Sequence, residues 1–176
     1  MRYILGVARK AIMKKSILVG KNNDFISLTS LLICGMYAGD PKQNIIYLSP
    51  SSSNVELGIA AREKLKESRE VDAREFSEIV KSGRIKEWEK LTEQNIKKKY
   101  GYKTKNAIYK NMKSINITLL NNEIFIMPEK QIKLDNYTAV KDSEGNVIKF
   151  NYNANITEED LGVAIRNAMN FCISNF

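Results

Sequence analysis

Histidine is absent from this sequence, and only two cysteines, three prolines and one tryptophan occur among its 176 residues. The absence of histidine removes the commonest general acid–base side chain and the commonest metal ligand, so catalysis is not expected. Cys34 and Cys172 have no metal-site spacing and are too few for a disulfide framework, which favours reduced thiols in a cytoplasmic protein. No catalytic or phosphate-binding motif is present, and we expect neither a cofactor nor a metal site.

Long apolar segments are missing as well. The longest apolar stretch, within residues 28–37, falls far short of the roughly 18 residues that a membrane helix needs. Basic residues interrupt any signal-peptide core near the N-terminus, namely Arg9, Lys10, Lys14 and Lys15. We therefore expect no membrane partner. The 43% hydrophobic and 27% charged residues are typical of one globular domain, here residues 1–176.

The net charge of +8 is concentrated in two stretches that contain no acid. Residues 1–22 carry six lysines or arginines, residues 94–113 carry seven lysines, and the remaining chain sums to −5. A nucleic-acid-binding patch requires such local charge. A lysine- and asparagine-rich composition also produces it without any function, so both interpretations stay open.

One strand–loop–helix pattern occurs twice at an offset of 104 residues. Leu57-Gly58-x-Ala60-x-Arg62 recurs as Leu161-Gly162-x-Ala164-x-Arg166, and each copy follows a capping-box signal, Ser53-x-x-Glu56 and Thr157-x-x-Asp160. The helices are predicted over residues 54–68 and 158–173, after strands at 45–48 and 147–150. Glycine is costly inside a helix, so its recurrence indicates close contact with another backbone. Gene duplication and repeated use of a good junction explain the copies equally well, and we predict that both arginines lie on the surface.

The other segments predict a single α+β domain, with a mostly antiparallel sheet and helices packed over one face. Residues 1–44 are poorly assigned; the β-prone runs at 3–7 and 17–19 include one candidate edge strand, because lysines there discourage edge pairing. A buried helix is predicted at 24–34. Further helices are predicted at 72–80, 84–99 and 106–112, and hairpins at 114–127, closed by Pro128, and at 137–152.

The segment Lys97–Lys113 combines seven lysines with Tyr100, Tyr102 and Tyr109. Basic charge with stacking rings is typical of a groove for single-stranded nucleic acid, whereas interleaved tyrosines are equally typical of a protein interface. A plain structural junction is the third interpretation. Because arginine is absent, bidentate base contacts and sequence-specific readout are not expected. Trp88 is interpreted either as a core residue or as a contact anchor.

Several of these motifs, in this order, resemble the CdiI family. They are Tyr100–Lys113, the hairpin ending in Pro128, Leu161-Gly162-x-Ala164-x-Arg166-x-Ala168, Leu48-Ser49-Pro50, and Leu57-Gly58 with Ser68-Arg69. CdiI proteins are the immunity proteins of bacterial contact-dependent growth inhibition systems, and the similarity is to the branch paired with ribonuclease toxins. The resemblance covers residues 45–172.

The resemblance implies a cytoplasmic protein without enzymatic activity. Its partner would be the C-terminal nuclease domain of a cognate CdiA-type exoprotein, bound 1:1 so that the active site or the RNA-binding surface is masked. Since nuclease clefts are basic, we place the contact on the acids from the end of the first repeated helix onward, on Trp88, and on the junction at residues 100–105. The predicted toxin-binding residues are Glu67, Glu70, Asp72, Glu75, Glu78, Trp88, Tyr100, Tyr102, Lys103 and Lys105. The alternative is a protein that binds single-stranded RNA or DNA through residues 97–113, although a nucleic-acid partner is not favoured.

Overall fold

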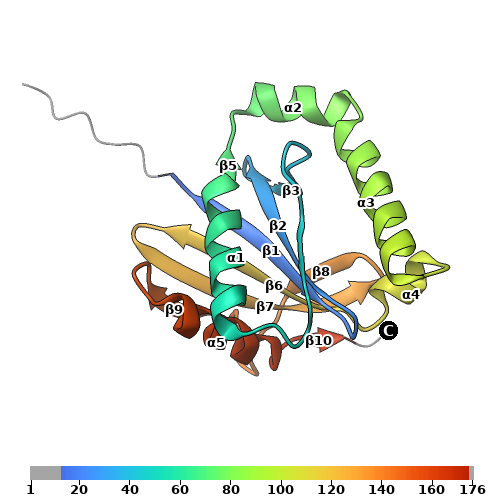
Figure 1. Ribbon diagram of the computed structural model, residues 1–176. Coiled ribbons are helices and arrows are strands. Elements are labelled where there is room, and N and C mark those ends of the chain that lie inside the picture. Colours follow the sequence, from blue (N-terminus) through green and yellow to red (C-terminus); the bar gives the residue numbers. More distant parts are fainter. Residues whose placement is uncertain (1–12, 175–176) are drawn as a thin grey trace, which may run out of the picture.

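The strands of the molecule form one curved sheet around which five helices are arranged. The structure is a computed structural model that describes residues 13–174, and Figure 1 shows the sheet with α1 and α5 against it and α2 and α3 arching to one side. The sheet order is β10-β7-β6-β1-β2-β3, with β4 and β5 paired to β2, and β8 and β9 paired to β7. All pairs are antiparallel except β5–β2 and β10–β7, which confirms the α+β prediction.

The strands are β1 Lys15–Lys21, β2 Ile26–Ile33, β3 Tyr37–Gly39, β4 Ile46–Leu48, β5 Arg69–Glu70, β6 Lys113–Leu120, β7 Glu123–Lys133, β8 Asn136–Ala139, β9 Phe150–Asn153 and β10 Ile173–Ser174. The helices are α1 Asn54–Glu67, α2 Ala73–Lys81, α3 Arg84–Tyr100, α4 Lys105–Tyr109 and α5 Glu158–Met169. The main core lies between α1, α5 and one sheet face, where Ile17, Ile26, Ile117 and Leu161 are fully buried.

The helix predicted at residues 24–34 is wrong: this segment forms β2. Its apolar run is short, and a short run does not distinguish a buried strand from a buried helix by periodicity. Pairing decides the outcome, because β2 lies between β1 on one side and β3 and β4 on the other. Of the two runs that included one candidate edge strand, residues 17–19 are not at an edge, since β1 is central and its Lys15 and Lys21 stand at the strand ends. The run at 3–7 lies outside the described residues.

The first predicted hairpin is confirmed in β6 and β7, whose turn places Asn121 and Asn122 at φ 53° and 62°. Pro128 does not close it; β7 continues to Lys133, and Pro128 lies between the stretch paired with β9, which ends at Ile126, and the stretch paired with β8, which begins at Glu129, where a missing N–H is tolerated. The second predicted hairpin reduces to the bridge between Lys141 and Val147. The strand expected at 147–150 begins at residue 150 instead, where β9 pairs with β7.

The repeated helices pack against each other through their glycines. A Cβ on Gly58 would overlap the backbone carbonyl of Glu158, and a Cβ on Gly162 would overlap that of Asn54. These contacts are reciprocal, since both pairs are related by the same offset of 104 residues. The predicted close backbone contact is confirmed, and its partner is the other copy of the motif.

The two arginines complete the same seam and do not extend into solvent as predicted. Each donates to two carbonyl oxygens in the loop before the opposite helix: Arg62 to Ala154 and Ile156, and Arg166 to Pro50 and Ser52. Their third contacts also match, because Arg62 pairs with Glu158 at 3.4 Å and Arg166 donates to Asn54 at 2.9 Å. The arginines therefore fix the two helix entrances to each other.

Candidate functional site

A cavity of about 670 Å³ lies between α3 and the sheet face turned away from α1 and α5. Side chains alternate between the two faces of a strand, so the neighbours of core residues on β1 and β2 form its floor. These floor residues are Leu18, Gly20, Ser27, Thr29 and Leu31. Helices were expected over one face only; α3 lies over the other face but stands off from it, and the cavity fills the space.

The helix α3 is attached mainly at its two ends. Ile96 is the one residue of α3 that is buried, and the helix lies between Gly83 and Gly101, which have φ values of 76° and 75°. Near the other end, Trp88 packs against Gly39 of β3. The middle of α3 is therefore a wall of the cavity and not a part of the main core.

An aromatic cluster anchors the C-terminal end of α3 to the sheet. The Phe25 ring lies 4.9 Å from that of Tyr100 and 5.4 Å, edge to face, from that of Tyr47, measured between centroids. The Tyr102 hydroxyl donates to the Asp24 carboxylate, and burial together with this bond raises the pKa of Tyr102 to about 12. We call this group the aromatic anchor: Phe25, Tyr47, Ile96, Tyr100, Tyr102, Ile108, Tyr109 and Met112.

Charged pairs hold the opposite end, near α2. Arg69 of β5 contacts the buried Asp40 at 2.8 Å and Glu75 of α2 at 3.1 Å. The hydrogen bonds to Asp40 are the main reason that the pKa of Arg69 is raised. Asp72 accepts a bond from the Glu75 amide and thereby caps α2. Arg69 thus joins α2 to the sheet.

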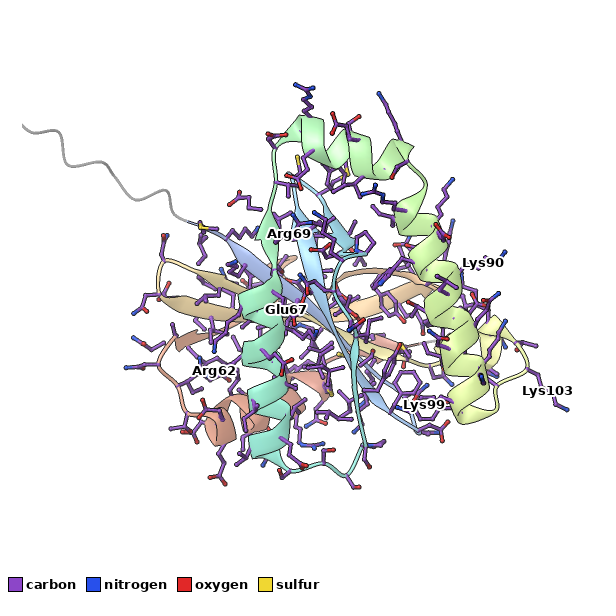
Figure 2. All side chains as sticks on the ribbon, turned by 45° about the horizontal axis from the view of Figure 1, so that its top comes forward. Arg62, Glu67, Arg69, Lys90, Lys99 and Lys103 are labelled. Atoms are coloured by element: carbon purple, nitrogen blue, oxygen red, sulfur yellow. The ribbon has the colours of Figure 1, made fainter. Side chains whose placement is uncertain are left out.

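The predicted toxin-binding residues fall into three places in the structure. Glu67 ends α1 and Glu70 ends β5; Glu67 accepts from the buried Lys64 at 2.6 Å, and Glu70 accepts from the Lys14 amide at 3.3 Å. Figure 2 shows Glu67 and Arg69 apart from Lys90, Lys99 and Lys103, which lie along α3 and beyond it. The second group, Asp72, Glu75, Glu78 and Trp88, belongs to α2 and the first half of α3. The third, Tyr100, Tyr102, Lys103 and Lys105, forms the junction after α3.

Within these groups the side chains differ in their freedom to meet a partner. Glu78 is exposed and contacts only Arg74 of its own helix, at 3.2 Å. Lys103 is exposed, whereas Lys105 pairs with Asp135 at 2.6 Å. Tyr100 and Tyr102 belong to the aromatic anchor, and Trp88 is half-buried at the cavity.

Sequence reasoning missed the cavity-lining residues Thr29, Tyr47 and Tyr137, whereas Tyr109 was singled out as one of the rings of the segment Lys97–Lys113. Tyr47 and Tyr137 are partly buried at the cavity, and this burial raises the pKa of both phenols. In the sequence of β2, apolar and polar residues alternate over Ile26-Ser27-Leu28-Thr29, as in a strand with two different faces. The prediction of a helix for this segment concealed that signal. Tyr137 carried no signal, because its place at the cavity depends on how β8 meets α4.

Within residues 13–174, no group of three or more His, Cys, Asp or Glu side chains is placed so that it could hold a metal ion. In the same part of the chain, each helix is too short or too polar to cross a bilayer.

The structure thus defines a single α+β domain with a cavity between one helix and the open face of a sheet. The model of the CdiI family, described as CDI immunity protein, matches residues 15–172, and the chain belongs to this family. The match confirms the resemblance seen over residues 45–172 and extends it to residue 15. No curated protein sequence matches the chain.

Two solved structures share this fold. A protein of unknown function from Neisseria meningitidis has 23% identity and a TM-score of 0.81, over 90% of this chain and 95% of that one. A chain of the CdiA-CT/CdiI toxin and immunity complex from Yersinia pseudotuberculosis has 22% identity and a TM-score of 0.79, over 90% of this chain and 97% of that one. At these identities the likeness shows the fold.

Proposed function

We propose that this chain is an immunity protein that binds and neutralises the C-terminal toxin domain of a cognate CdiA-type protein, one to one, in the cytoplasm. Membership of the CdiI family supports the role, and a neighbour of the same fold comes from a toxin and immunity complex. The role requires binding and no turnover, which agrees with a sequence that lacks histidine. That the toxin is a nuclease, and a ribonuclease in particular, stays a prediction from the resemblance.

The observation that carries the proposal is the cavity beneath α3. A stable protein interface usually buries about 1,600 Å² and derives most of its affinity from a few desolvated, often aromatic, anchors. Here Trp88, Tyr47 and Tyr109 line a concavity whose volume can accommodate several side chains of a partner. We therefore place the toxin contact on α3, on the cavity and on the exposed face of α2, with Glu78, Trp88 and Lys103 at its margins.

Co-expression tests the function directly. We expect the toxin domain encoded immediately upstream to arrest growth when expressed alone. Growth should recover with this chain, and the two proteins should co-purify as a 1:1 complex by light scattering. Intact RNA or DNA in the rescued cells, compared with the arrested cells, identifies the toxin's substrate. If neither complex nor rescue is obtained, the proposal is wrong.

A variant separates the cavity from other surfaces. Thr29→Trp fills the floor of the cavity from β2, where the outward face is not part of the main core. We expect it to abolish rescue while the protein stays folded by circular dichroism. Val163→Trp, on the exposed side of α5, is the matched control and should still rescue growth.

A further inference from the structure

We propose that α2 and α3 form a strap that opens over the cavity, and that Trp88 seated on Gly39 is its latch. The inference rests on the proposed function, because the strap would control how the toxin domain reaches the cavity. It adds a moving element and two named residues to that function. The supporting observations concern the pivot, the elbow and the latch, and each can be examined without the toxin.

The pivot is the aromatic anchor at the C-terminal end of α3. Ile96 is buried there, Tyr100 packs on Phe25, and Tyr102 just beyond the helix is bonded to Asp24. Two helical turns separate Ile96 from Trp88, a lever of about 12 Å. Because the helix is fixed at this end and loosely packed along its length, a small rotation at the anchor moves Trp88 by the width of a side chain.

The elbow is Gly83, which connects α2 to α3 with φ 76°. A Cβ built on Gly83 meets no atom within 4 Å, so the side of this corner on which a side chain would stand is open. Glycine adopts the left-handed region readily and tolerates a change of backbone angle there. The two helices can therefore alter their mutual angle when α3 swings.

Three small features hold the strap closed, and the first of them is the latch. Trp88 lies on Gly39, Ile79 of α2 is buried, and Glu75 pairs with Arg69 at 3.1 Å. When Glu75 leaves, Arg69 keeps the buried Asp40 as its partner, so opening strands no buried charge. A second cavity, of about 220 Å³, lies beside Trp88 and Ile79, which means that this contact is loosely packed.

Gly39 is the seat of the latch for a steric reason. A Cβ on Gly39 would stand 2.5 Å and 2.6 Å from ring atoms Cζ3 and Cη2 of Trp88. Gly39 lies in β3 and does not adopt a positive φ, so its backbone accepts other residues. The space is therefore needed by the indole ring alone. Replacing Gly39 with alanine should push the ring off its seat and favour the open strap.

Tryptophan fluorescence of the full chain tests the latch, because Trp88 is the only tryptophan. We expect Gly39→Ala to shift the emission to the red and to raise acrylamide quenching about twofold, while the far-ultraviolet dichroism is unchanged. Val163→Ala, an equally small change on the exposed side of α5 and away from the pivot, the elbow and the latch, should leave emission unchanged. Emission of Gly39→Ala equal to that of the wild type would overturn the inference. Should Gly39→Ala fail to fold, Glu75→Gln weakens the pair with Arg69 and leaves Gly39 and Trp88 unchanged. Acrylamide quenching of Glu75→Gln equal to that of the wild type would then overturn the strap.

Association with the toxin domain tests what the strap does. If the closed state occludes the cavity, raising the open fraction should speed association of Gly39→Ala in stopped-flow mixing. In the opposite experiment, Gly39→Cys and Trp88→Cys, with Cys34→Ala and Cys172→Ala, are alkylated by a short bismaleimide crosslinker whose spacer contains a reducible disulfide. We expect about tenfold slower association than after reduction; equal rates would overturn the strap. If neither the reduced variant nor the wild-type protein binds the toxin domain, the proposed function is wrong. The latch is then tested by the fluorescence of Gly39→Ala alone.

Discussion

At the scale of single residues, the molecule depends on a few side chains whose size or charge has no substitute. Gly58 and Gly162 admit the opposite helix to within backbone contact, and Arg62 and Arg166 satisfy carbonyl groups that the loops before the helices leave unpaired. The glycine contacts were predictable, since a repeated helical glycine costs stability unless space requires it. The arginine contacts were not, because they depend on which loop faces which helix.

Substitution of a seam glycine should destabilise the fold. Gly162→Leu places a side chain where the carbonyl of Asn54 lies, so we expect a loss of about 3 kcal/mol or more in the free energy of unfolding. Urea titration measures it. The neighbouring Val163→Leu faces solvent and should cost less than about 0.5 kcal/mol. A Gly162→Leu midpoint equal to that of the wild type would contradict the seam.

Glu129 should make stability depend on pH. Burial raises the pKa of its carboxyl above the ordinary value of 4.5, although the Ser114 hydroxyl bond opposes this. A raised pKa means that the folded state binds more protons, so the contribution of Glu129 is present below pH 4.5 and is lost as pH rises through the raised value. We expect Glu129→Gln to be more stable than the wild type at pH 7 and to lose that advantage on acidification. Urea titrations across this range check it, and Glu144→Gln, at an exposed turn, is the control.

At the scale of elements, short sequence motifs were enough to predict a helix wherever nearby residues cap its first turn. Ser53 and Glu56 form the full capping box of α1, and the Thr157 hydroxyl caps α5, so both helices could be predicted from short motifs. The strand β2 could not, because its identity comes from neighbours far along the chain. The same dependence hid the cavity, whose floor and wall come from β1, β2 and α3.

The helix α2 offers a matched pair of charge reversals. Glu78→Lys removes only the exposed contact with Arg74, so we expect reduced toxin affinity, by about tenfold, with unchanged stability. Glu75→Lys also breaks the pair with Arg69 and should in addition lower the melting temperature by a few degrees. Calorimetric titration with the toxin domain and thermal melting separate the two effects. Unchanged affinity of Glu78→Lys would remove the outer face of α2 from the interface.

At the scale of the whole molecule, the excess of positive charge is less available than the sequence implied. In the lysine-rich segment, Lys97 pairs with Glu93 and Lys105 with Asp135, each at 2.6 Å, and Lys99 lies over the rings of Tyr47 and Tyr100. Three of the seven lysines of the segment are thus engaged within the protein. Of the three interpretations open for it, the structural junction is the one that the contacts favour, and an interface can be built on its exposed remainder.

Salt should distinguish the two candidate partners. A protein lock that depends on packing in the cavity should retain most of its affinity near 0.5 M salt, whereas binding to nucleic acid should fall steeply, linearly in log–log form. Binding of the toxin domain and of single-stranded RNA, each measured by fluorescence anisotropy across a salt series, checks this. A toxin affinity that collapses with salt, together with tight RNA binding at low salt, would favour the nucleic-acid function.

The reciprocal seam between α1 and α5 also has a consequence in time. The two halves are separated by 104 residues, which a ribosome adds in about 5–20 s at usual rates of elongation. During that interval Arg62 has none of the carbonyls it will eventually bind, and Gly58 is an unfilled notch in an exposed helix. The seam can close only after both halves have been made, so the fold is completed late in synthesis.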